Sequence, residues 1–298
     1  MRKLGAEKLV RECYKHSIQS ELKYRIEKFL NSKHTVSKQV QDYELELDYS
    51  RSGLEKDLYL HSIREEESVN ILKSELKQGM NVVDIGSNIG YYAFMEAETV
   101  GDEGKVLAIE PTTESFERFL ENLNRNNYSN IDYLNKAAGN KSAKLGVRKY
   151  ETPNLNRIVS KERGQENVDV EPLDKLAEGF NPDLVRMDVE GYELNILEGM
   201  EEILARKSLT LFLEVHPRKI SRQYKRDIDN LWSILSENNF KVKYLIRHPM
   251  KAHLSYFFRK PHPPRVVHEP DKGVYETLEE YSEFFQHDRN FRIFLEKK

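Results

Sequence analysis

The feature that most constrains the fold is an alternation of apolar, strand-like segments with helix-like segments, which begins at residue 81. The stretch NVVDIGSNIGYYAF, residues 81–94, runs from an apolar strand through a glycine turn into an apolar helix. KVLAIEP follows at residues 105–111, then a helical pattern, then IDYLNKAAG at residues 131–139. Strands that alternate with helices predict a parallel sheet with right-handed crossovers.

The alternation is interrupted at residues 141–180, whose short β-like pieces predict an inserted hairpin that covers the sheet edge or the site. It resumes with DLVRMDVEG, LTLFLEVHP, FKVKYLIRHP and AHLSYFFRKP. We therefore predict an α/β fold with seven core strands and helices on both faces. The last two strands have no helix between them, so an antiparallel pair should end an otherwise parallel sheet.

We divide the chain into a helical and strand extension at residues 1–60, a main domain at 61–262 and a C-terminal extension at 263–298. Lysine and arginine number 47 against 50 acids, so the net charge of -3 gives no overall attraction to nucleic acid or anionic membranes. The single cysteine, Cys13, excludes an internal disulfide framework. With no apolar run of about 18 residues and no secretory signal pattern, we expect a cytoplasmic protein without a transmembrane segment.

Residues 4–30 have apolar side chains at close to helical spacing with basic residues between them. This pattern predicts a basic amphipathic helix. Such a helix can make a peripheral membrane contact, but packing on its own domain or on a second subunit of a homodimer is favoured.

The glycine turn excludes two common ligand classes. A phosphate-binding P-loop needs Gly-Lys-Ser/Thr at the helix start, where this chain has Gly90-Tyr91-Tyr92. A dinucleotide fingerprint needs G-x-G-x-x-G, whereas Gly86 and Gly90 enclose Ser-Asn-Ile.

Two acidic residues suggest what the turn does hold. Asp84 precedes the turn, and its carboxylate suits a ligand that carries an ammonium or sulfonium group. Glu110 lies at the end of the next strand, where an acid can accept hydrogen bonds from ribose hydroxyls. Asn88 can adopt the left-handed backbone that a tight turn needs. A ligand with an adenosyl group and a cationic tail would offer ribose hydroxyls to Glu110 and a positive charge to Asp84.

Four motifs in order between residues 82 and 217, VVDIGSNIGYY, VLAIEP, LVRMDVEGYELNILEGM and LFLEVHP, resemble the FkbM family of S-adenosylmethionine-dependent methyltransferases. The resemblance implies a Rossmann-like class I methyltransferase fold and methylation of a hydroxyl, often on a sugar, glycolipid or natural product. It implies that the cofactor is S-adenosylmethionine. The residues it assigns to that cofactor are Asp84, Gly86, Ser87, Asn88, Gly90, Tyr91, Glu110, Pro111, Ala137 and Asp188.

Four further polar residues should meet at the carboxyl ends of the later strands, where ligands bind in open α/β sheets. They are Asp188, Glu190, Glu214 and His216. A hydroxyl acceptor needs a base, and His216 has a reference pKa near neutrality, with Glu190 or Glu214 able to orient it or share the role. The same four could instead coordinate Mg²⁺ or Mn²⁺, which we consider the lesser alternative.

Two other functions remain open at this point. Residues 241–268 interleave basic and aromatic side chains without an acid, which could serve an RNA methyltransferase. However, DVEG departs from the Asn/Asp-Pro-Pro-aromatic motif usual in methylation of nucleic-acid amines, so a small-molecule or glycan acceptor is preferred and nucleic acid is not expected. A binding module that kept the fold and lost the reaction is the third alternative.

Overall fold

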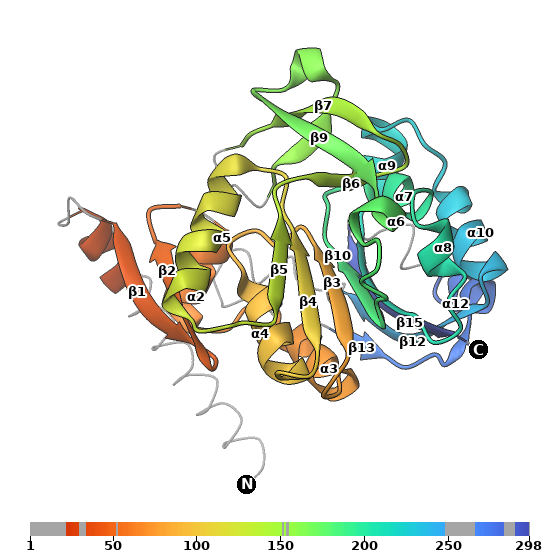
Figure 1. The fold of residues 1–298 in the computed structure, drawn as a ribbon, viewed down its shortest axis with the longest axis horizontal. Coiled ribbons are helices and arrows are strands. Elements are labelled where there is room, and N and C mark those ends of the chain that lie inside the picture. The colour runs from red at the N-terminus through yellow and green to blue at the C-terminus, as the bar shows by residue number, and fades with distance from the viewer. Residues whose placement is uncertain are drawn as a thin grey trace, which may run out of the picture.

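One large sheet organises the fold (Figure 1), and the computed structural model describes residues 22–29, 34–51, 53–150, 152, 155–247, 266–282 and 290–297. Among these residues the sheet has nine strands in the order β13-β12-β15-β11-β10-β3-β4-β5, with β14 also paired to β12. The strands are β3 (Asn81–Ile85), β4 (Lys105–Ile109), β5 (Ile131–Leu134), β10 (Leu184–Met187), β11 (Thr210–Val215), β12 (Phe240–Arg247), β13 (Val266–His268), β14 (Lys272–Gly273) and β15 (Phe291–Lys297).

The five strands β5, β4, β3, β10 and β11 are all parallel, as the alternation predicted. Both faces of this sheet are buried, because successive residues of β3 pack in two different clusters of buried hydrophobic side chains. Val82 packs in one cluster with Phe94, and Val83 packs in the other with Leu194. The predicted α/β class with helices on both faces is confirmed.

Helices α3 (Glu66–Glu75), α4 (Tyr91–Val100) and α5 (Thr113–Arg125) contribute to the first cluster. Helices α7 (Glu193–Leu197) and α10 (Ile228–Glu237) contribute to the second. The shorter elements are α2 (Leu54–His61), η2 (Lys161–Arg163), α6 (Leu173–Leu176), α8 (Glu201–Leu204), α9 (Pro217–Gln223) and α12 (Val274–Glu280).

The C-terminal side of the sheet differs from the expectation. Strand β15 lies between β11 and β12 and is antiparallel to both. The sheet therefore exceeds seven strands, and residues 291–297 are an inner strand of it. The sequence FRIFLEK suits this place because Phe291 and Ile293 pack in one cluster and Phe294 in the other. Residues 252–261, the expected partner of β12, lie outside the described residues.

A hairpin near the N-terminus, β1 (Thr35–Val40) and β2 (Tyr43–Asp48), packs on α5. The amides of Glu44 and Glu46 donate to the side-chain oxygens of Asn126 (2.9 Å) and Asn122 (2.8 Å). Of the predicted helix at residues 4–30, the structure describes a helix at residues 22–29, and the first 21 residues lie outside it. No helix within the described ranges has the length and apolar character to cross a membrane.

A second, four-stranded sheet stands above the carboxyl ends of β3 and β4 (Figure 1). Its strands are β6 (Ala137–Gly139), β7 (Ala143–Arg148), β8 (Arg157–Val159) and β9 (Glu166–Pro172), in the order β6-β9-β7-β8. This sheet occupies the segment where an inserted hairpin was expected. It also includes β6, so IDYLNKAAG divides between the two sheets.

Candidate active site

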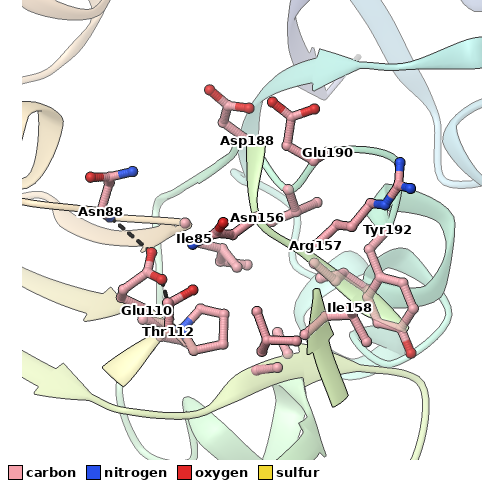
Figure 2. A pocket seen from close by; sticks show the side chains of 18 residues that line it. Ile85, Asn88, Glu110, Thr112, Asn156, Arg157, Ile158, Asp188, Glu190 and Tyr192 are labelled. Atoms are coloured by element: carbon pink, nitrogen blue, oxygen red, sulfur yellow. Dashed lines mark hydrogen bonds between the residues drawn. The ribbon is translucent and has the colours of Figure 1, made fainter. Parts of the chain in front are cut away.

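Two hollows meet at the carboxyl ends of the parallel strands. The first encloses about 610 Å³, part of it open to solvent, between the main sheet and the second sheet. Figure 2 shows Glu110 on one side of it, Asp188 and Glu190 on another, and Arg157 beside Tyr192. Its lining comprises Ile85, Gly86, Asn88, Ile109, Glu110, Pro111, Thr112, Ala137, Ala138, Val147, Asn156, Arg157, Ile158, Asp188, Val189, Glu190, Tyr192 and Ile196.

The glycine turn after β3 forms the floor between the hollows. Gly86 has φ 85°, and a Cβ there would collide with the carbonyl oxygen of Asp188, so glycine is the residue that fits. Asn88 has φ 51°, the left-handed conformation expected for it. Gly90 (φ 99°) precedes α4. The chain thus passes close beneath the loop after β10 and leaves the turn open to a ligand.

Glu110 follows β4 and lines the first hollow, as predicted. Its carboxylate accepts hydrogen bonds from the amides of Asn88 (3.0 Å) and Thr112 (2.9 Å) (Figure 2). Burial raises the pKa of Glu110 to about 7. A carboxylate has about four acceptor positions, so this group can still receive hydroxyl donors from the hollow. Pro111 and Ala137 line the same hollow.

The second hollow, about 490 Å³ including open space, shares Gly86, Asn88 and Asp188 with the first. Its other lining residues are Leu54, Arg64, Glu65, Ser87, Tyr91, Tyr92 and Arg186. It is therefore bounded partly by the segment between α2 and α3, which carried no motif in the sequence.

Glu65 lines the second hollow together with the shared Asp188. Its backbone is left-handed (φ 58°), which is unusual for glutamate, and its side chain is held from three directions. Tyr92 donates from its hydroxyl (2.8 Å), Arg292 donates from Nη2 (2.6 Å) and Arg64 lies 3.3 Å away through Nε. Burial alone would raise the pKa of Glu65, but Arg292 and Arg64 lower it to about 2. Glu65 is thus ionised at neutral pH.

The structure places Asp84 differently from the expectation. Asp84 is fully buried and lines neither hollow. Its Oδ1 is 2.5 Å from Nη1 of Arg186, which stacks on the Tyr92 ring at 3.7 Å from the centroid. Ser87 donates from its hydroxyl to the Asp84 carbonyl (2.8 Å). In place of a ligand contact, Asp84 balances the charge of Arg186 behind the turn.

The four residues predicted at the rim do come together. Nε2 of His216 lies 3.4 Å from Glu190 and 3.7 Å from Glu214. Its Nδ1 is 2.6 Å from Glu193 of α7, a partner that the sequence analysis did not identify. Burial would lower the pKa of His216, but Glu193 and the other acids raise it to about 9. His216 is therefore protonated at neutral pH, which differs from the expected near-neutral base.

Two of the rim carboxylates are neutralised by cations. Glu214 accepts hydrogen bonds from Arg292 and Asn290, which lie at the start of β15 and just before it. Glu190 contacts the ammonium of Lys219. These partners come from segments without a motif, so local sequence carried no signal for them.

Asp188 differs from its neighbours because, among the described residues, its ion pair is a long one, with Nη2 of Arg186 3.9 Å away. Its side chain is 29% exposed and lines both hollows. Burial and the nearby Glu214 carboxylate raise the pKa of Asp188 to about 6. At neutral pH it is largely ionised and faces the junction of the hollows.

Ligand atoms of Asp188, Glu214 and His216 lie within 4.8 Å of one another, a spacing that a metal ion can bridge. Their partners oppose this use. A divalent ion would have to displace Arg292 from Glu214 and a proton from His216.

Comparison with known proteins now identifies the fold family. Residues 84–242, more than half of the chain, match the family model described as "Methyltransferase FkbM domain". The chain belongs to the FkbM methyltransferase family. This confirms the resemblance and the predicted class I methyltransferase fold.

Individual relatives are more distant. The chain is 28% identical over 161 residues to a hexuronic acid methyltransferase of Haloferax volcanii, a match that covers 51% of this chain and 62% of that protein. It is 35% identical over 60 residues to a protein-L-isoaspartate O-methyltransferase of Methanococcus maripaludis, covering 20% and 28% of the two chains. The match thus spans less than two thirds of either relative. The crystal structure of methyltransferase FkbM from Methylobacillus flagellatus superposes with a TM-score of 0.45 at 22% identity, covering 64% of this chain and 47% of that one.

Proposed function

We propose that this chain transfers a methyl group from S-adenosylmethionine to an oxygen atom of a sugar or sugar acid. The observation that carries the proposal is the pair of hollows that meet at Gly86, Asn88 and Asp188. Together they suit a ligand with a nucleoside at one end and a charged amino-acid tail at the other. When bound, this cofactor supplies a methyl group on a positively charged sulfur, activated for in-line displacement.

The first hollow fits the adenosine part. Glu110 is available to ribose hydroxyls, while Pro111, Ala137 and Ala138 provide an apolar wall for the base. The predicted roles of Glu110, Pro111 and Ala137 are kept in the proposal.

The second hollow fits the methionine tail. Glu65 supplies the negative charge for the ammonium group, and Arg64 supplies the positive charge for the carboxylate. Tyr91 and the turn residues Ser87 and Asn88 line the same space. In this assignment Glu65 takes the role that the sequence analysis gave to Asp84.

Proton removal from a hydroxyl acceptor is assigned to Asp188. It is partly exposed, largely ionised at neutral pH and placed at the junction, whereas protonated His216 has no capacity to accept a further proton. We assign to His216, Glu190 and Glu214 a positioning role, because they are held by Glu193, Lys219 and Arg292. A carboxyl acceptor would need no base, since it is already ionised at neutral pH.

Support for the acceptor class comes from the Haloferax relative, whose name specifies a hexuronic acid. The RNA alternative rests on residues 241–268, of which the structure describes only β12 and β13. The non-enzymatic alternative predicts cofactor binding without turnover.

One set of experiments separates these functions. Calorimetry with S-adenosylmethionine tests binding, and transfer of a labelled methyl group to glucuronic acid, glucose or bulk RNA tests the acceptor class. We expect transfer to one of the sugars. Binding without transfer to any of them would refute the proposed reaction, and transfer only to RNA would favour the alternative.

A pair of glycine variants gives a matched control for cofactor binding. Gly86→Ala should abolish binding because the new Cβ meets the Asp188 carbonyl. Gly179 has a similar positive φ (77°), but no atom lies within 4 Å of a Cβ added there. The variant Gly179→Ala should therefore bind S-adenosylmethionine as the wild type does. Equal effects of the two changes would place the cofactor elsewhere.

The metal alternative makes a separate prediction. If Mg²⁺ or Mn²⁺ on Asp188, Glu190, Glu214 and His216 were required, a chelator would abolish methyl transfer and added ion would restore it. We expect activity to survive the chelator because Arg292 already neutralises Glu214.

A further inference from the structure

An apolar stripe faces outward on the helix of residues 22–29. Leu22 is 57% exposed, Ile26 48% and Phe29 88%. Their spacing of four and three residues places them along one face of the helix. Three large apolar side chains on two helical turns form a continuous exposed strip.

The opposite face of this helix is fixed to the protein. Tyr24 is 6% exposed and its ring lies 6.4 Å from Tyr49 and 6.2 Å from Tyr59, centroid to centroid. Nζ of Lys28 donates to the carbonyl of Ser50 (2.8 Å). The helix is therefore docked by one side and presents the apolar stripe on the other.

Basic residues flank the stripe. Helical geometry places Lys23 on one flank and Arg25 on the other. The Lys23 side chain is 74% exposed, and its ammonium lies 3.7 Å from a carboxylate oxygen of Glu27. The acid of this helix, Glu27, accepts a hydrogen bond from Tyr59 on the docked side. Residues 1–30 contain eight lysines and arginines against four acids, although the whole chain has a net charge of -3.

We propose that this helix binds an anionic lipid surface, with Leu22, Ile26 and Phe29 entering the boundary between headgroups and acyl chains. Lys23 and Arg25 would then meet lipid phosphates, as in amphipathic helices that lie in the membrane plane. A second copy of the chain is the less suitable occupant, because pairing two such stripes would bring their basic flanks together. The membrane contact thus takes up a face of the helix that the described part of the chain leaves exposed.

The test is sedimentation of the full chain with lipid vesicles. We expect it to sediment with vesicles that contain phosphatidylglycerol, to remain in solution with pure phosphatidylcholine, and to be released by high salt. The triple variant Leu22→Ser, Ile26→Ser, Phe29→Ser should lower the partition coefficient by more than about tenfold. Tyr275→Ser removes a similarly exposed apolar residue (51%) elsewhere and should bind as the wild type does.

Thermal melting shows whether the triple variant is folded, and we expect little change because the three side chains are exposed. The variant Lys23→Gln, Arg25→Gln tests the flanks without touching the stripe, and it should weaken binding to anionic vesicles alone. Equal binding to both vesicle types, or wild-type binding by the triple variant, would overturn the proposal. So would a wild-type dimer that becomes monomeric in the triple variant without any vesicle binding.

Discussion

Glu65→Gln tests whether the second hollow holds the methionine tail. The substitution keeps the size of the side chain and removes one negative charge from a position that Arg292, Arg64 and Tyr92 hold in place. A hydrogen bond to a charged group contributes about 1.5–3 kcal/mol. Loss of such a contact to the ammonium group should weaken affinity about 10- to 150-fold, since 1.4 kcal/mol is about tenfold.

The assay is calorimetric titration with two ligands. S-adenosylhomocysteine carries the ammonium and carboxylate tail, whereas methylthioadenosine lacks it and reports on the first hollow alone. We expect Glu65→Gln to weaken binding of the first ligand and to leave the second unchanged. Glu66→Gln, an exposed neighbour, controls for a general charge effect.

Glu65 also has a structural role, so folding must be measured as well. A lower melting temperature with unchanged methylthioadenosine affinity would show that the first hollow survives. If both ligands lost affinity equally, or neither did, the assignment of the tail to this hollow would be refuted.

Three further predictions follow from the same charges. Asp84→Asn should act mainly on stability, lowering the free energy of unfolding by about 3–5 kcal/mol in a denaturant titration because Arg186 is left buried without its partner; an unchanged midpoint would contradict this. Asp188→Asn should reduce turnover of a hydroxyl acceptor by roughly 10²–10⁴ with cofactor affinity nearly kept, and wild-type turnover should rise with pH through about 6 and then level off; a pH profile that is the same in both proteins would exclude Asp188 as the base. The pKa of His216 is raised to about 9 in the folded protein, so its pairing with Glu193 stabilises the fold fully below the unfolded pKa of about 6.5, and this stabilisation is lost as pH rises through 9. In denaturant titrations at several pH values, His216→Gln should therefore reduce the fall in the free energy of unfolding over this pH range. The same pH dependence in both proteins would count against the ion pair.

The parallel half of the sheet could be predicted from the sequence because its strands are short apolar runs separated by helical patterns. The position of β15 could not, because an apolar run such as FRIFLEK shows that a strand is buried but not which neighbours it joins. The pairing of β15 with β11 depends on contacts across about 80 residues of chain, which no local pattern records.

The site, too, could be predicted only where it does not depend on contacts between distant segments of the chain. The convergence of Glu110, Asp188, Glu214 and His216 followed from the rule that carboxyl ends of parallel strands meet at one edge. The raised pKa of His216 did not follow from it, because Glu193 of α7 is its main cause. The ion pair between Glu214 and Arg292 of β15 did not follow from it either. For Asp84, one signal was present: an arginine inside the apolar run LVRM lies directly beside it in the register of β10 and β3.

The rim depends on a strand, β15, that is synthesised after both of its neighbours in the sheet. Of the described strands it is the last to leave the ribosome, yet it lies between β11 and β12, which are made earlier. Until it inserts, those two strands lack the neighbour that pairs with both, and Glu65 and Glu214 lack the guanidinium that joins them. A nascent chain can therefore form the glycine turn and the parallel strands around it before it has a finished rim. Insertion of β15 between β11 and β12, more than formation of the parallel strands, should therefore decide when Glu65 and Glu214 gain their shared partner Arg292.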